Sequence, residues 1–314
     1  AFVAFAEAKI DAAVLEVGLG GRLDATNAVD PAVAVITSIS YDHMQILGDT
    51  LTMIAREKAG IIRPGALVIS APQYDEAMRM IEEVCQSHQA RLVLVGRDWQ
   101  WEPGMFDFEG QAFTVGGQEY WLPLMGEHQL VNAVTAMAAI EGFGERTGLA
   151  VAPQAVKAGL AGVNWLGRLE ILGRKPYVIV DGAMNGDSAE KLIQALQRYF
   201  PGQPITFIFG ASSDHPIRDM LAALLPHAAH MFMLASRHPR AEKAERLTAL
   251  AEAMGYQTTP MPDVASALEQ ALAGAGQIDL ICVTGSLFLV ADAREAWLRR
   301  NGLPLPPLDP LVVS

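Results

Sequence analysis

Short apolar runs alternate with longer amphipathic segments along almost the whole of this 314-residue chain. Such alternation is typical of parallel sheets covered by helices, because a parallel strand reaches its neighbour only through a crossover connection. The expected strands are 12–17, 32–36, 67–70, 91–95, 177–181, 205–210, 230–235 and 278–284. The expected helices are 52–60, 75–89, 129–146, 153–161, 188–200, 217–225, 241–254, 264–273 and 287–300. The sequence therefore predicts an α/β fold.

The alternation changes in two places. Between residues 99 and 123, polar and aromatic residues alternate and glycines interrupt them, which predicts an antiparallel meander attached to the sheet. Near residues 163–168, a stretch with Gly, Asn and Trp separates the first series of elements from a second one. We therefore expect two domains, 1–165 and 166–314. The first residues resemble the second half of a helix, so the chain is expected to begin within a domain.

Acidic residues outnumber basic ones by 35 to 23, which gives a formal net charge of −12. Such a chain repels nucleic acid and anionic lipid, so we expect neither as a partner, although a local cationic pocket is compatible with this total. Cys85 and Cys282 are too few for a disulfide framework and are expected to be buried and unreactive. No apolar run is long enough to cross a membrane, and no secretory signal opens the sequence. The expected location is the cytoplasm.

A glycine-rich segment follows the first expected strand. It reads Glu16-Val-Gly-Leu-Gly-Gly-Arg-Leu-Asp-Ala-Thr-Asn27 and begins with a carboxylate at the strand end. Ligands gather at the carboxyl ends of parallel strands, and glycines let the backbone approach a bound phosphate or carboxylate. A carboxylate there can hold a cation. The alternative is a tight turn with a surface Glu.

Two further segments carry residues that can bind a metal or a phosphate. Asp42 and His43 follow the second expected strand, at the edge where Glu16 is expected, and could join it as ligands. The alternative for His43 is a hydrogen-bonded structural residue. Lys58 lies near the end of a short helix that runs back toward the sheet. Its alternative is the ordinary attraction of a lysine to a helix C-terminus.

Taken together, these segments resemble the Mur ligase superfamily, and most closely the folylpolyglutamate synthases, which are often also dihydrofolate synthases. Seven segments in the family's order carry the resemblance: 16–27, 40–43, 54–61, Gly126-Glu-His-Gln-Leu-Val-Asn-Ala133, Gly167-Arg-Leu-Glu170, Asp181-Gly-Ala-Met-Asn185 and Thr284-Gly-Ser-Leu287. The resemblance implies the remainder of a P-loop-type ATPase domain with a mostly parallel sheet, the Mur ligase middle domain, in residues 1–165. It implies a Rossmann-like C-terminal glutamate-ligase domain in 166–314.

The resemblance also implies roles for individual residues in the first half. Glu16 and His43 correspond to magnesium ligands, and Lys58 to a lysine that is carbamylated. Carbamylation would turn this cation into an oxygen donor suited to Mg²⁺. His128 and Asn132 correspond to residues near the nucleotide base, with Asn132 as the direct contact. Their alternative is a hydrogen-bonded pair at a helix N-terminus.

In the second half, Arg168 corresponds to a phosphate-binding residue, since a guanidinium offers a bidentate fork to phosphate oxygens. Asp181 corresponds to an acceptor for ribose hydroxyls, and Asn185 completes the nucleotide-binding set. Lys58, His43 and Arg168 are the expected catalytic residues. The alternative for 168–170 is a surface ion pair, and Ser286 is expected to be a helix cap.

Three features depart from the family pattern. No G-x-x-x-x-G-K-[ST] run occurs in the sequence, whereas the family carries this phosphate-binding loop upstream of Glu16. We therefore expect a fragment lacking on the order of 100 N-terminal residues. Met184 stands where the family has His, and a thioether cannot replace the hydrogen bonds of an imidazole. Ser213-Asp-His-Pro216 stands where the family usually has Asp-Lys-Asp.

The reaction that the resemblance implies is ATP-dependent amide formation. The γ-phosphoryl group of ATP activates a carboxylate of a folate or dihydropteroate as an acyl phosphate, and L-glutamate attacks it through its amine. ATP and Mg²⁺ are thus the implied cofactors, and the protein is expected to act as a monomer. Two alternatives stay open at this point: a Mur ligase with another acceptor, and a non-catalytic nucleotide-binding or interaction protein.

Overall fold

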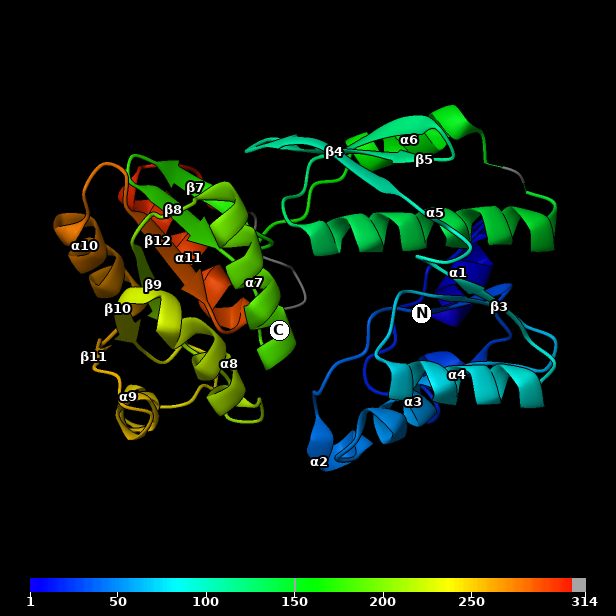
Figure 1. The fold of residues 1–314 in the computed structure, drawn as a ribbon, viewed down its shortest axis with the longest axis horizontal. Coiled ribbons are helices and arrows are strands. Elements are labelled where there is room, and N and C mark those ends of the chain that lie inside the picture. Colours follow the sequence, from blue (N-terminus) through cyan, green and yellow to red (C-terminus); the bar gives the residue numbers. More distant parts are fainter. Residues whose placement is uncertain (150, 307–314) are drawn as a thin grey trace. The chain divides into compact units, whose positions relative to one another are not determined.

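The computed structural model describes residues 1–149 and 151–306. They fall into two compact units. The first contains Ala1–Ile39, Met44–Trp99 and Thr135–Val151, and the second contains Ser40–His43, Gln100–Val134 and the residues from Ala152 onward. The long helix α5 (Glu127–Thr147) therefore contributes residues to both units. Figure 1 gives the labels of the elements along the chain.

A three-stranded parallel sheet forms the centre of the first unit. Its strands, in spatial order, are β1 (Val33–Ile36), β2 (Leu67–Ser70) and β3 (Arg91–Leu94). The helices are α1 (Phe2–Ala8), α2 (Met44–Leu47), α3 (Leu51–Ala59) and α4 (Asp75–Ser87), with a 3₁₀ helix η1 at Ala25–Ala28. All four residues of β2 are buried. Apolar side chains of α3 and α4, among them Ile54 and Ile81, form one core with the sheet residues Ala34, Ile36 and Val68.

The strand expected at residues 12–17 is not formed. The prediction rested on the apolar residues of Ala12–Val17, but a strand is stable only where a neighbour satisfies its backbone N–H and C=O groups. Among the described residues, β1 is an edge strand of its sheet, and no strand pairs with its outer side. The side chain of Val14 is fully exposed.

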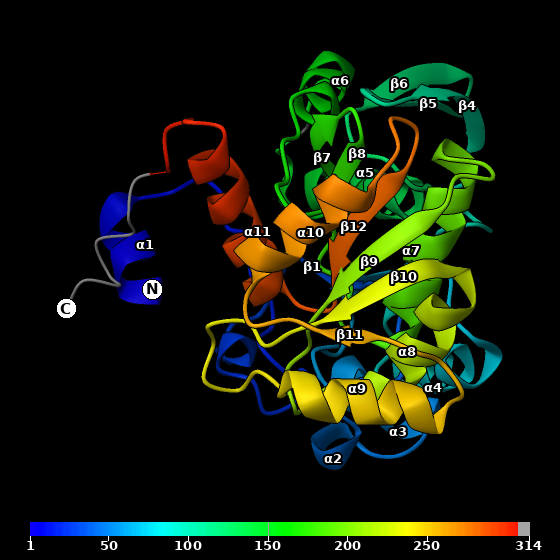
Figure 2. The same ribbon diagram turned by 90° about the vertical axis from the view of Figure 1, so that its left-hand side faces the viewer.

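A six-stranded sheet forms the centre of the second unit, and Figure 2 shows it with its helices. In spatial order its strands are β11 (Thr259–Pro260), β10 (Ala228–Met233), β9 (Ile205–Phe209), β12 (Leu280–Thr284), β8 (Tyr177–Val180) and β7 (Glu170–Arg174). All neighbouring strands are parallel except β7, which pairs antiparallel with β8. The four long parallel strands thus occur as the sequence predicted, within two residues at each end.

Helices cover both faces of this sheet. On one face, α7 (Gly186–Tyr199), α8 (Ile217–Leu224) and α9 (Ala244–Ala253) share a core with Ile179, Phe207 and Cys282. On the other face, α10 (Val264–Gly274) and α11 (Leu287–Arg300) pack on the alternate residues, such as Val180, Ile208 and Val283. Burial on both faces explains why these strands read as continuous apolar runs rather than as alternating ones. Truncating a ring such as that of Phe207 to Ala would cost about 3–5 kcal/mol.

The antiparallel meander predicted at residues 99–123 is present as β4 (Glu102–Asp107), β5 (Gly110–Val115) and β6 (Gln118–Leu122). It forms a sheet of its own instead of joining a parallel one. Helix α6 (Pro153–Ala161) belongs to the same unit. Phe108, at the β4–β5 turn, packs against Tyr177 and Phe200, so the meander is anchored on the six-stranded sheet by aromatic contacts.

Besides 3₁₀ helices such as η1, the sequence prediction missed three elements of the described part of the chain. They are α2, the antiparallel strand β7 and the two-residue strand β11. Each is held by tertiary pairing or packing, which a local pattern does not reveal. Both cysteines are free and buried, as expected. In the described part of the chain, no helix is both long enough and apolar enough to cross a membrane.

Candidate active site

Asp181 follows β8 directly and carries a buried carboxylate, with 7% of the residue exposed. Its Oδ2 accepts a hydrogen bond from the backbone N–H of Leu169 (2.9 Å), and its Oδ1 accepts one from Ala183 (2.9 Å). Burial raises the pKa of this carboxyl, and the two hydrogen bonds and the charge of Arg168 act in the opposite direction. The carboxylate therefore ties the segment before β7 to the end of β8, and its remaining lone pairs can accept from a ligand.

Arg168 lies half-buried in this same segment. A Cβ atom on Gly182 would lie 2.5 Å from its Nη1 atom and 2.4 Å from Cδ2 of Leu287. The absence of a side chain at Gly182 thus leaves the room that the guanidinium occupies. Among the described residues, Arg168 donates no hydrogen bond and forms no ion pair. Its guanidinium donors are therefore available to an anion.

The surface ion pair considered for residues 168–170 is not the arrangement found. Glu170 instead receives two hydrogen bonds from the guanidinium of Arg294, at 2.8 and 3.0 Å. It also accepts a hydrogen bond from the backbone N–H of Gly167 (2.8 Å). Leu169, with φ of 47°, is buried in a left-handed conformation that is uncommon outside glycine. Hydrogen bonds to Asp181 and Glu170 thus fix the turn that carries Arg168 on both sides of this residue.

His128 occupies the first turn of α5, as expected. Burial lowers its pKa to about 4, helped by the positive charges of Lys191 and Arg168 and opposed by Asp187. Its imidazole is therefore neutral at physiological pH. Gly126, at φ of 97°, makes room for the ring, because a Cβ there would lie 2.6 Å from Cε1 of His128.

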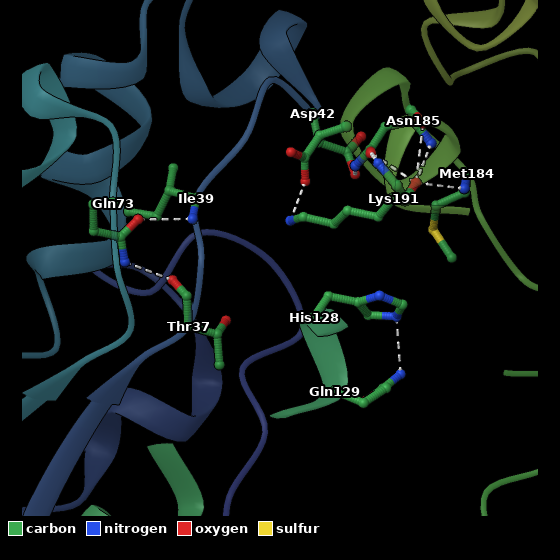
Figure 3. Close-up of polar contacts among 11 residues, drawn as sticks. Thr37, Ile39, Asp42, Gln73, His128, Gln129, Met184, Asn185 and Lys191 are labelled. Carbon is green, nitrogen blue, oxygen red and sulfur yellow. Dashed lines mark hydrogen bonds and ion pairs between the residues drawn. The ribbon is translucent and has the colours of Figure 1, made fainter. Parts of the chain in front are cut away.

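The polar side chains after His128 form a short hydrogen-bonded series. Nε2 of Gln129 lies 3.2 Å from Nε2 of His128, and the Asn132 amide donates to Oε1 of Gln129 at 3.0 Å. Figure 3 shows the first of these contacts. The alternative of hydrogen bonding between His128 and Asn132 at a helix N-terminus is therefore present in an indirect form. Gln129, which the sequence analysis did not select, connects the two side chains. No other described residue hydrogen-bonds to the carbonyl oxygen of the Asn132 amide, which can therefore contact a ligand.

Asn185 is the N-cap of α7. Its Oδ1 accepts from the backbone N–H of Ser188 (2.9 Å), and the Ser188 hydroxyl accepts from the backbone N–H of Asn185 (3.0 Å), which completes a capping box. Ser188 also accepts from the backbone N–H of Met184 at 3.0 Å (Figure 3). The Asn185 amide donates to Oδ2 of Asp42 at 3.1 Å. Asn185 therefore has structural partners on both ends of its amide.

Lys191 is a residue of this site that sequence reasoning missed. Its ammonium group lies 2.6 Å from Oδ2 of Asp187, one helical turn earlier on α7. It also acts electrostatically on His128. An i, i+4 acid–lysine pair on an amphipathic helix is common on surfaces, so no local signal distinguished this one.

Asp42 and His43 follow β1 and belong to the second unit. Besides the amide of Asn185, the Asp42 carboxylate contacts Nδ1 of His215 at 3.6 Å. Upstream of them, Gln73 bridges the loop by accepting from the backbone N–H of Ile39 (2.8 Å) and donating to the carbonyl of Thr37 (2.9 Å), as Figure 3 shows. The segment that leads from β1 to His43 is thus fixed by side-chain contacts.

The glycine-rich loop of the first unit is organised by Asp24. Its carboxylate accepts from the backbone N–H groups of Gly18 (3.1 Å), Leu19 (3.2 Å) and Thr26 (2.9 Å), and from the Thr26 hydroxyl (2.7 Å). These hydrogen bonds, led by that of the hydroxyl, lower the pKa of Asp24 to about 2. Asp24 was not expected as a key residue, although the Asp-x-Thr spacing is a known turn signal.

Glu16 and Lys58 belong to the first unit. Glu16 is exposed, and among the described residues its carboxylate makes no hydrogen bond and no ion pair. Lys58 lies in the last turn of α3, as expected. The carbonyl oxygen of Lys58 lies 3.0 Å from where a Cβ on Gly21 would stand, so the glycine-rich loop packs closely on this helix. Within the described ranges, no three His, Cys, Asp or Glu side chains gather into a group that could hold a metal ion.

Comparison with known proteins shows the family of the chain. The protein-family model of the Mur ligase middle domain matches residues 1–140. The family model of the Mur ligase glutamate ligase domain matches residues 167–287. The dihydrofolate synthase/folylpolyglutamate synthase of Bacillus subtilis is 33% identical over 309 residues, which cover 94% of this chain and 70% of that protein. The chain belongs to the folylpolyglutamate and dihydrofolate synthase family of Mur ligases.

Solved structures of the same family superpose closely on the chain. FolC of Escherichia coli in complex with DHPP and ADP has a TM-score of 0.83 and 33% identity, over 95% of this chain and 69% of that one. A bifunctional folylpolyglutamate synthase/dihydrofolate synthase with Mn, AMPPNP and L-glutamate bound has a TM-score of 0.78 and 31% identity, over 96% and 69%. The expected α/β fold with Mur ligase middle and C-terminal domains is therefore confirmed.

Family membership also decides between the functions considered from the sequence. Folylpolyglutamate and dihydrofolate synthases are ATP-dependent ligases that add glutamate to folates, and the relatives found carry these names across almost the whole of this chain. This supports the ligase assignment over a non-catalytic protein and over a Mur ligase with another acceptor.

Proposed function

We propose that this chain carries the ligase site of an enzyme that joins L-glutamate to a folate or dihydropteroate carboxylate with hydrolysis of ATP to ADP and phosphate. The observation that carries the proposal is Arg168. It is half-buried and lies beside Asp181, and among the described residues it makes neither a hydrogen bond nor an ion pair. In a chain of net charge −12, such a cation at the carboxyl end of a parallel strand suits a phosphate group.

The residues around Arg168 suit a nucleotide. His128 is neutral, so its ring can pack against a base or exchange hydrogen bonds without adding charge. We propose that Asn132 contacts the base through the free end of its amide. Asp181 is proposed to accept from ribose hydroxyls, because its two backbone hydrogen bonds leave further lone pairs. Asn185 is proposed to act in the same site mainly by fixing the start of α7.

Glu16, His43 and Lys58 are the proposed holders of a magnesium ion. The donor chemistry fits: the Glu16 carboxylate is exposed and without a hydrogen bond or ion pair in the described part of the chain, and carbamylation would give Lys58 an oxygen ligand. When bound, the ion would neutralise phosphate charge. Arg168 would supply the positive charge on the other phosphate oxygens, which makes Lys58, His43 and Arg168 the proposed catalytic set.

Other properties of the protein stay predictions. The domain division at residues 165 and 166, the monomeric state and the cytoplasmic location belong to this group. The relatives whose printed names include folylpolyglutamate and dihydrofolate synthase support either a folate or a dihydropteroate as the acceptor.

The proposal is tested with the complete gene product by following the incorporation of labelled L-glutamate. We expect incorporation that requires ATP, a divalent cation and one of the two acceptors, dihydropteroate or tetrahydrofolate. Release of ADP should match the glutamate added, one for one. ATP hydrolysis that is independent of acceptor, or no incorporation with either acceptor, would contradict the proposal.

A further inference from the structure

We propose that His215 is a positioning residue that holds the Asp42 carboxylate and thereby fixes the neighbouring His43. The contacts lie within the second unit. The link to catalysis rests on the proposed function, because it uses the assignment of His43 as a metal ligand.

Asp42 is the centre of these contacts. Its Oδ1 accepts a hydrogen bond from the backbone N–H of His43 at 2.8 Å, and its Oδ2 accepts from the amide of Asn185 at 3.1 Å. Nδ1 of His215 approaches Oδ1 to 3.6 Å, which is ion-pair distance and slightly longer than a hydrogen bond. The carboxylate is thus held from both sides.

The burial of His215 favours a contact between its ring and the Asp42 carboxylate. Only 11% of its side chain is exposed, and Nδ1 is buried without a hydrogen bond among the described residues. A buried polar atom without a partner is costly, and the Asp42 oxygen is the acceptor that the structure places near it. The ring also lies 5.6 Å from that of His43, centroid to centroid. A movement of a few tenths of an ångström would complete a hydrogen bond from His215 to Asp42.

The loop that carries His215 is itself anchored. The backbone N–H of Ser213 donates to the carbonyl of Arg240 at 2.9 Å, and the Arg240 guanidinium lies 2.6 Å from Oδ2 of Asp214. Pro216 follows as the N-cap of α8, and its ring restricts the backbone there. The backbone on both sides of His215 is therefore held in place, as a positioning residue requires.

His43 needs such support. Its φ of 48° lies in the left-handed region, which a non-glycine residue keeps only where its surroundings hold it. The hydrogen bond from its own N–H to Asp42 fixes this conformation, and His215 and Asn185 fix Asp42. Removal of the His215 side chain should therefore make the backbone at His43 more mobile and its ring orientation less fixed.

The first test measures amide hydrogen exchange in the peptide that covers residues 40–47, in the complete gene product without metal. His215→Ala should speed this exchange about three- to tenfold, the size expected for the loss of one polar contact to a carboxylate. His215→Asn should restore the slow rate, because the Asn amide can place a donor near the position of Nδ1. His230→Ala removes an exposed histidine and should change nothing. Unchanged exchange in the His215→Ala protein would overturn the proposal.

The second test measures Mn²⁺ binding by electron paramagnetic resonance in the same proteins. We expect His215→Ala to raise the dissociation constant for Mn²⁺ about tenfold, as for other residues that orient a metal ligand. His215→Asn should restore the original dissociation constant. If exchange accelerates while the affinity for Mn²⁺ is unchanged, the link from Asp42 to the metal ligand is wrong. If the unmodified protein binds no Mn²⁺ but its exchange responds as expected, the proposed role of His43 fails and the positioning of Asp42 stands.

Discussion

The Asn185 amide donates a hydrogen bond to the Asp42 carboxylate across 143 positions of sequence, while its carbonyl oxygen caps α7. One side chain thus stabilises a helix terminus and also holds the loop that carries His43. The two contacts use different atoms of the amide, so substitutions can separate them.

Asn185→Ala should lose both contacts, whereas Asn185→Ser should keep a capping oxygen and lose the reach to Asp42. An N-cap contributes about 0.5–2 kcal/mol. We expect the Ala protein to be less stable than the Ser protein by about 1 kcal/mol in urea denaturation. Equal stabilities of the two proteins would show that the cap contributes nothing measurable here.

The pKa of His128 should appear as a pH dependence of stability. Burial lowers it from the ordinary 6.5 to about 4, so between these values the unfolded chain binds more protons than the folded one. Stability should therefore fall as the pH is lowered from about 6.5 toward 4, by on the order of 2–3 kcal/mol. Denaturation at a series of pH values measures it.

The His128→Gln protein is the control for this titration. Its free energy of unfolding should lack the part of the pH dependence that comes from His128. Lys191→Met should raise the pKa of His128 toward its usual value, because it removes a nearby cation and leaves Asp187 unpaired. Nuclear magnetic resonance of the imidazole protons reads this directly. A His128 pKa that does not respond to Lys191→Met would contradict the electrostatic account.

Gly182→Ala should disturb the site through contact alone. The added Cβ would overlap Nη1 of Arg168 and Cδ2 of Leu287, at 2.5 and 2.4 Å. We expect a loss of about 1–3 kcal/mol in stability and a higher KM for ATP. Gly159→Ala is the matched control, because this helical glycine has open space around it and Ala should stabilise the helix by up to about 1 kcal/mol.

Asp24→Ala should loosen the loop of residues 18–26, since one carboxylate accepts four hydrogen bonds there. Proteolysis after Arg22 should become faster in the folded protein, and Asp30→Ala serves as the comparison. The pKa of Asp24 is about 2, below its usual value, so its support for the loop should persist at pH 4 and be lost as the pH falls through 2. Equal cleavage rates in the two variants would exclude this role.

Much of the fold was predictable because buried parallel strands have a distinctive composition. The runs at 67–70, 205–209 and 280–284 are apolar except for one Ser or Thr each, as burial on both faces favours. The segment at 12–17 is also mostly apolar but lacks a neighbouring strand in the described structure, so composition alone predicted it wrongly. A pattern reports whether a segment can be a strand, and pairing decides whether it is one.

The nearness of Asp181 to the segment of Arg168 was predictable, because both lie where a motif coincides with a strand end. His215 contacts Asp42, and Lys191 acts on His128, across segments far apart in the sequence. Gln129 makes its hydrogen bonds within one helical turn, to His128 and Asn132. Their side-chain types are common at exposed positions, so no local pattern marks them. Asn185 shows a related limit, because its structural role as a cap could be read from its place before a helix, whereas its contact with Asp42 could not.

The central claim is that Arg168 binds a phosphate group of the nucleotide, and steady-state kinetics of Arg168→Lys and Arg168→Ala test it most directly. We expect the Ala protein to lose at least about 100-fold in kcat/KM for ATP, and Lys to recover only part of this, because an ammonium cannot form the bidentate contact. Arg218→Ala, on an exposed arginine of α8, should retain full activity. An Arg168→Ala protein with unchanged kcat/KM for ATP would contradict the account.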